Sequence, residues 1–237
     1  MKKLSKALKR LNEYHQICWF LLLLLIPIFG FGHNISESNA RFVESINGPA
    51  IVPFMYLGAK HMVTGYDHLL FLFGVLFFLH RFKDIFLYVT VFTVGHSITL
   101  MLGVLLDLNV NAFLIDAIIG LSVVYKAFEN IDGFKQIFGR QLDTRIAVFI
   151  FGLCHGLGLA TKLQEFALSD NGLIINILSF NIGVEIGQAI VLAVILVVLS
   201  QWRRIRLFQS HAFVSNCILM SLGFMLAGYQ MAGYMLS

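Results

Sequence analysis

The stretch LIINILSFNIGVEIGQAIVLAVILVVL, residues 173–199, decides the fold class of this chain. It contains one ionisable residue, Glu185, and exceeds the ~20 apolar residues that a helix needs to cross a bilayer. The composition agrees, because 58% of the 237 residues are hydrophobic and only 13% are charged. That charged share is about half that of an ordinary soluble domain. The sequence therefore predicts an all-α, polytopic transmembrane helix bundle whose solvent is the lipid bilayer.

Five further apolar segments lie on either side of this one and predict a six-helix transmembrane domain over residues 51–237. In chain order the six segments are Ile51–Leu79, Ile85–Leu106, Ala112–Phe128, Ile146–Phe166, Leu173–Leu199 and Ala212–Leu236. The first is longer than a span requires, which leaves room for a part that lies along the membrane interface. No charged or low-complexity linker separates the segments, so we expect one domain.

The N-terminus has the form of a secretory signal sequence, because the basic residues of 1–10 precede a short apolar run, Ile17–Gly32. Residues 1–32 are therefore expected to be either a cleaved signal peptide or an uncleaved anchor helix. The polar residues 33–50 that follow are expected to form an extracytoplasmic loop.

The basic residues indicate which helix ends face the cytoplasm. Lysine and arginine gather in residues 80–84, 129–145 and 201–206, whereas 107–111 and 164–172 contain neither. Because positive residues stay on the cytoplasmic side, we expect a bacterial-type cytoplasmic membrane protein with its C-terminus outside. The formal charge of +4 is small and is read as topology information. The charge thus gives no reason to expect nucleic acid as a partner, and the expected partner at this point is the lipid bilayer.

Ionisable side chains inside membrane helices are costly and usually functional. With a rise of 1.5 Å per residue, His68, His96, His155 and Glu185 each lie about 15–22 Å from the cytoplasmic end of their segments. The hydrocarbon layer is about 30 Å thick. Four groups from four helices are therefore predicted to converge near one plane in mid-bilayer.

The neighbours of His68 reinforce this prediction. His61 lies seven residues earlier on the same helix face, and Asp67 is adjacent in sequence. Imidazole and carboxylate groups bind nickel, zinc, copper and iron, whereas the three cysteines form no C-x-x-C pair that would indicate a thiolate site. A divalent transition metal ion, nickel or zinc, is thus expected at the histidines, with Asp67 or Glu185 as a ligand or as a hydrogen-bond acceptor that orients a histidine. The predicted metal ligands are His61, Asp67, His68, His96, His155 and Glu185.

The residues alone leave three functions open. The first is transport of a divalent metal through the bundle. The second is an intramembrane metal-dependent hydrolase, in which a metal on His68, His96 and His155 activates water and Glu185 or Asp67 is the general base. The third is an accessory subunit whose polar groups, including the stripe Asn181, Glu185 and Gln188, only hold helices together.

Four strings, in this order, resemble landmarks of the HupE/UreJ family. They are HMVTGYDHLLFL (61–72), FTVGHSITL (92–100), FGLCHGLGLA (151–160) and FNIGVEIGQ (180–188). The first contains the H-x5-D-H signature of that family. HupE/UreJ proteins are regarded as nickel permeases and are associated with hydrogenase and urease maturation. The resemblance therefore implies transport of a nickel-like metal, with His61, Asp67, His68 and His155 as the inherited candidates.

The sequence departs from the nickel-permease pattern at the second motif of that family, F-H-G-x-A-H-G-x-E. Only its later His-Gly is present, as His155-Gly156. Phe151 stands where the family motif has its first histidine, and Gly158 stands where it has its glutamate. The resemblance thus points to the broader branch of the family and supports metal binding more strongly than it supports nickel specificity.

Overall fold

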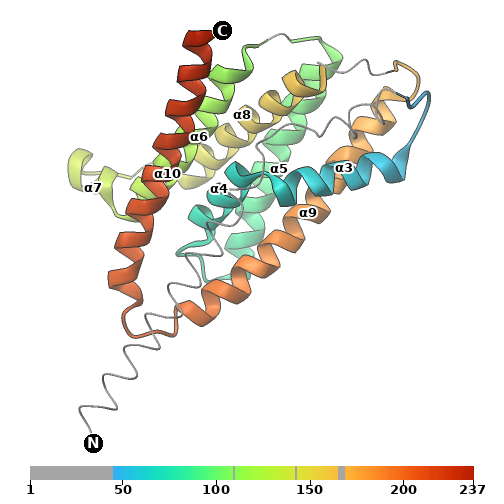
Figure 1. Ribbon diagram of the computed structural model, residues 1–237. Coiled ribbons are helices and arrows are strands. Elements are labelled where there is room, and N and C mark those ends of the chain that lie inside the picture. Colours follow the sequence, from blue (N-terminus) through green and yellow to red (C-terminus); the bar gives the residue numbers. More distant parts are fainter. Residues whose placement is uncertain (1–44, 109, 142, 165–168) are drawn as a thin grey trace, which may run out of the picture.

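The computed structural model of the chain describes residues 45–237, except 109, 142 and 165–168 (Figure 1). The described residues contain helices and connections, and no strand. The helices are α3 (Ile51–Thr64), α4 (Tyr66–Leu76), α5 (Phe82–Leu105), α6 (Ala112–Asn130), α7 (Gly133–Phe138), α8 (Thr144–Gln164), α9 (Leu173–Trp202) and α10 (Phe208–Leu236). The all-α prediction is therefore confirmed. The predicted signal or anchor segment, residues 1–32, and most of the loop 33–50 lie outside the described residues.

Four of the described helices are long and apolar enough to cross a membrane, namely α5 from Lys83 onward, α8, α9 and α10. Together with the composition they make the chain a multi-pass membrane protein. The 19-residue helix α6 is not among the four, and it carries three charged side chains, Asp116, Lys126 and Glu129. The count of six spans thus remains a prediction.

The first predicted segment is not a continuous helix. It is divided at Gly65, where the backbone is extended with φ −72° and ψ 102°. A Cβ atom on Gly65 would lie 2.7 Å from Nδ1 of His68 and 3.0 Å from the carbonyl oxygen of His61, so only glycine fits this break without displacing its neighbours. The part before the break, α3, runs along α9 (Figure 1).

Glycines determine how closely α5 and α8 approach each other. A Cβ atom on Gly152 would overlap the carbonyl oxygen of Phe92, and one on Gly156 would overlap that of His96. These two glycines beside His155 thus bring the backbones of α5 and α8 into contact. Small residues of this kind allow the close helix packing that membrane bundles use.

Two other helix pairs meet in the same way. The α3–α9 contact is made by Gly58, Gly183 and Gly187, and the α6–α10 contact by Gly120 and Gly223; each of these glycines faces backbone atoms of the opposite helix. The pairs α5–α8, α3–α9 and α6–α10 make the most extensive contacts among the described helices.

The two ends of the bundle differ in charge. In Figure 1 the α5–α6 connection lies at the top and the α9–α10 connection at the bottom. The upper connection, 107–111, contains no lysine or arginine, and the lower one contains Arg203, Arg204 and Arg206. Arg203 also donates hydrogen bonds to the carbonyl oxygens of Leu76 and Phe77, which satisfies the C-terminal end of α4.

Candidate metal-binding site

Three side chains lie close enough together to share one ion. They are Asp67 and His68 in the first turn of α4 and His155 in the middle of α8, whose ligand atoms all lie within 4.8 Å of one another. Their exposed fractions are 4%, 3% and 2%. The His68 and His155 ring centroids are 4.8 Å apart. The fold thus unites two of the four predicted mid-membrane groups with the carboxylate beside one of them.

The Asp67 carboxylate fixes the orientation of His68. Its Oδ1 atom accepts a 2.7 Å hydrogen bond from the His68 backbone N–H and lies 2.8 Å from Nδ1 of the His68 ring. A histidine held through Nδ1 by a carboxylate has Nε2 as its ligand atom. This contact matches the second role expected for Asp67, a hydrogen-bond acceptor that orients a histidine.

His61 and His96 flank the same cluster at different distances. The His61 ring lies 4.9 Å from that of His68, across the break at Gly65, whereas the His96 ring lies 6.5 Å from that of His68. His96 is fully buried, with the Asn181 amide as its polar neighbour. The arrangement therefore consists of a close group of three donors with two further histidines beside it.

Glu185 does not lie with these residues. It is exposed on α9, next to Ile182 and Ile186, which are 49% and 45% exposed. The close packing of Gly183 and Gly187 against α3 sets which face of α9 is buried. Depth along the helix was too coarse a guide to the position of Glu185, because depth does not show which face of α9 carries the residue.

The two other members of the predicted polar stripe connect α9 to α5. Thr93 donates a 2.8 Å hydrogen bond to Oε1 of Gln188, and Ser97 donates a 3.3 Å hydrogen bond to Oδ1 of Asn181. Asn181 and Gln188 therefore form hydrogen bonds between helices, which is the structural role that the sequence left open for them. Thr93 and Ser97 lie four residues apart on one face of α5, and this spacing was the signal in the sequence that both could contact the same neighbouring helix.

Sequence reasoning missed two ion pairs. Lys162 of α8 lies 2.7 Å from Asp116 of α6, and Lys126 lies 2.6 Å from Glu129 within α6. Thr144, the first residue of α8, also donates to Glu129. Opposite charges three residues apart in a helix, as in Lys126 and Glu129, were a readable signal. The Asp116–Lys162 pair joins segments that are distant in the sequence, and no sequence pattern indicated it.

Polar residues also lie between the Asp116–Lys162 pair and the cluster. Tyr66, Asp67, Asp116 and Gln230 line a small cavity among α4, α6 and α10. Gln230 donates a 3.4 Å hydrogen bond to Oδ2 of Asp116. The carboxylate of Asp67 thus faces His68 on one side and this cavity on the other.

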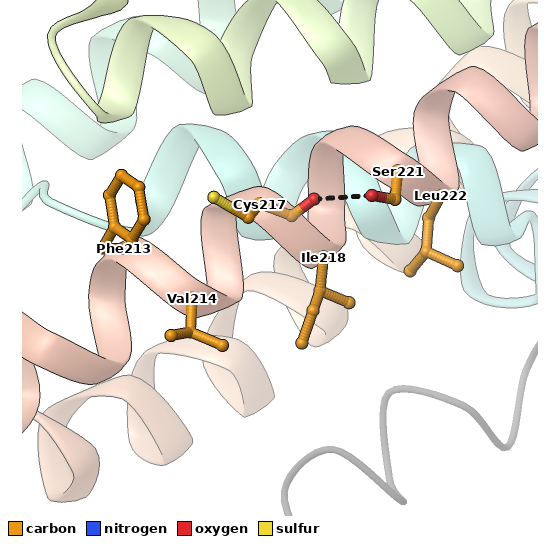
Figure 2. A pocket seen from close by; sticks show the side chains of 6 residues that line it. All are labelled: Phe213, Val214, Cys217, Ile218, Ser221 and Leu222. Atoms are coloured by element: carbon orange, nitrogen blue, oxygen red, sulfur yellow. Dashed lines mark hydrogen bonds between the residues drawn. The ribbon is translucent and has the colours of Figure 1, made fainter.

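A shallow groove on the outer face of α10 is separate from the cluster (Figure 2). All its lining residues come from α10, and Phe213 and Val214 among them are 59% and 55% exposed. Its one hydroxyl, of Ser221, donates a 3.0 Å hydrogen bond to the carbonyl oxygen of Cys217. A polar group bonded within its own helix is what a lipid-facing surface requires.

Comparison with known proteins identifies the family. A family model described as HupE / UreJ protein matches residues 37–237, so the chain belongs to the HupE/UreJ family and the resemblance drawn from its motifs is confirmed. This family is associated with nickel or cobalt transport or with urease and hydrogenase maturation. No curated protein and no solved structure matches the chain.

Proposed function

We propose that this HupE/UreJ protein carries a divalent, nickel-like transition metal ion across the membrane, with Asp67, His68 and His155 as its central binding site. One observation carries the proposal: three donor side chains from α4 and α8 lie within 4.8 Å of one another inside a bundle of apolar helices. Imidazole and carboxylate donors suit nickel, zinc and their neighbours. The metal is the cargo of the proposed reaction.

The break at Gly65 supports transport. Many transporters bind their substrates where a membrane helix is discontinuous, because the half-helix ends and the freed backbone groups line the site. Here Asp67 and His68 lie in the first turn of such a half-helix, α4. The N-terminal end of a helix carries a partial positive charge, which opposes a bound cation. This opposition favours release, and a carrier must release its ion as readily as it binds it.

His61 and His96 are proposed as secondary ligands next to the central site. The ring of each is a neighbour of the His68 ring, and the two residues belong to different helices, α3 and α5. An ion that moves through the bundle exchanges ligands stepwise, so imidazoles next to the central site lower the cost of leaving it.

The hydrolase alternative has less support, because it needs a carboxylate placed as a general base. Asp67 is engaged with His68 through both the backbone N–H and the ring. Glu185 is exposed on α9, beside the exposed side chains of Ile182 and Ile186. The observed contacts of Asp67 thus support its role in orienting His68, and Glu185 lies apart from the cluster, so no observation favours a general base.

The direct test is uptake of nickel, cobalt and zinc into proteoliposomes that contain the purified protein. We expect saturable uptake of at least one of these ions by the wild type and its loss in His68→Ala and His155→Ala. Glu185→Gln is the matched control, since it alters an exposed ionisable residue of α9, and it should transport normally. Wild-type uptake no greater than that of empty vesicles for all three ions would contradict the proposal.

Metal content separates a transported ion from a resident one. We expect the detergent-purified protein to lose its metal on dialysis and to bind nickel again on titration, with His68→Ala failing to rebind it. Stoichiometric metal that survives dialysis would instead favour a catalytic or structural ion.

A further inference from the structure

A layer of aromatic rings lies directly beside the histidines. Phe71 follows His68 by three residues on α4, Phe92 precedes His96 by four on α5, and Phe151 precedes His155 by four on α8. Three or four residues make one helical turn. Each histidine thus has a phenylalanine one turn away on its own helix.

All three phenylalanines are displaced from the histidines toward the same end of the bundle. The C-terminal part of α4 lies near the end of α6, because Asn130 donates a hydrogen bond to the carbonyl oxygen of Gly74. The start of α8 lies at that end too, through the bond from Thr144 to Glu129. The short α4–α5 connection brings the start of α5 there as well. This end carries the basic loops.

The aromatic rings contact one another and the histidine rings. The Phe71 ring centroid lies 5.4 Å from that of Phe92 and 5.7 Å from that of Phe151. The His155 ring lies 5.1 Å from Phe92 and 5.7 Å from Phe71. Phe71 and Phe92 are 1% and 2% exposed. Phe151 is partly buried. The three rings therefore lie directly beside the proposed metal site, with Phe71 between the other two.

Polar groups return on the far side of this layer. A pocket at the basic end is lined by polar residues that include Lys126, Glu129, Asn130, Gln141 and Thr144. Along the bundle the order is thus a histidine layer, an aromatic layer and a polar pocket. An ion cannot be hydrated or coordinated among packed phenyl rings, and hydrophobic constrictions of this kind gate ion pathways.

We propose that Phe71, Phe92 and Phe151 form the inner gate of the transport path, and that the pocket around Glu129 is the vestibule into which the gate opens. This inference rests on the proposed transport function and adds to it the residues that block release. In the arrangement described here Phe71 contacts both other rings, which we interpret as the closed gate. Transport requires the three rings to separate.

Substitutions at Phe151 test the gate. Phe151→Ala removes one ring, Phe151→Leu removes part of the bulk while keeping an apolar side chain, and Phe224→Ala is the matched control, because Phe224 is 55% exposed on α10. The measurements are the initial rate of nickel uptake at saturating nickel and the nickel affinity in detergent. If opening the gate limits turnover, we expect uptake to rise about threefold or more in Phe151→Ala and less in Phe151→Leu, with nickel affinity unchanged and the control at the wild-type rate.

Several outcomes would overturn the inference. If Phe151→Leu binds nickel with wild-type affinity and transports at or below the wild-type rate, the layer is not the barrier. If Phe151→Ala loses nickel binding, the uptake rate of Phe151→Leu becomes the test of the gate. Loss of nickel binding in both variants would also contradict the proposal, because it gives Phe151 no role as a ligand. A wild type without uptake of any metal would instead contradict the transport function itself.

Discussion

At the scale of single residues, the Asp67 carboxylate has the clearest role. It holds His68 through two contacts, of 2.7 Å and 2.8 Å, and is a carboxylate beside the proposed cation site. Substitution of a residue that orients a metal ligand typically lowers metal affinity about 10–100-fold. We expect Asp67→Asn to weaken nickel binding by that factor in titration calorimetry. Asp107→Asn, at an exposed aspartate, is the control, and equal affinities in both variants would contradict the assignment.

His155 and His96 should contribute differently to nickel binding, although both lie in the middle of an apolar helix. The His155 ring lies 4.8 Å from His68 and the His96 ring lies 6.5 Å away. We therefore expect His155→Ala to abolish nickel binding and His96→Ala to leave a weaker but measurable site. A titration in which the two variants lose the same affinity would place His96 in the central site after all.

At the scale of helices, the glycine contacts determine how the ligands meet. Gly156 faces the carbonyl oxygen of His96 with no space for a side chain. Overpacking a tight contact costs about 1–3 kcal/mol. We expect Gly156→Val to lower the midpoint of thermal unfolding in detergent, whereas Gly228→Ala, at a position with open space around it, should leave the midpoint unchanged. Equal midpoints for Gly156→Val and the wild type would show that α5 and α8 separate easily.

The sequence predicted where helices lie better than it predicted where they break and which of their faces are buried. Apolar length identified α5, α8, α9 and α10, because a bilayer demands about 20 apolar residues whatever the tertiary contacts. The break at Gly65 depends on side chains that converge around one glycine, which periodicity does not reveal. Glu185 was placed with the histidines by depth alone, but depth along a helix says nothing of rotation about its axis. His68 and His155 do lie together in the structure, with ring centroids 4.8 Å apart.

At the scale of the whole molecule, the charge asymmetry predicts orientation. Ser237 is at the C-terminus and Arg204 lies in the α9–α10 connection. Each is replaced by a single cysteine in a chain whose native cysteines are changed to serine. We expect a membrane-impermeant maleimide to label Ser237→Cys in intact spheroplasts and Arg204→Cys only after permeabilisation. The reverse pattern would invert the topology, with the gate then facing outward.

The glycine-packed helix pairs have a mechanical consequence. The pair α5–α8 is held together by backbone contact, and α4 lies outside that pair, connected to α6 and α9 by less extensive contacts. His155 belongs to the pair, whereas Asp67 and His68 belong to α4. Under the proposed transport function, an ion bound by all three side chains links α4 to the α5–α8 pair. We therefore expect ion binding and release to change the spacing between α4 and that pair.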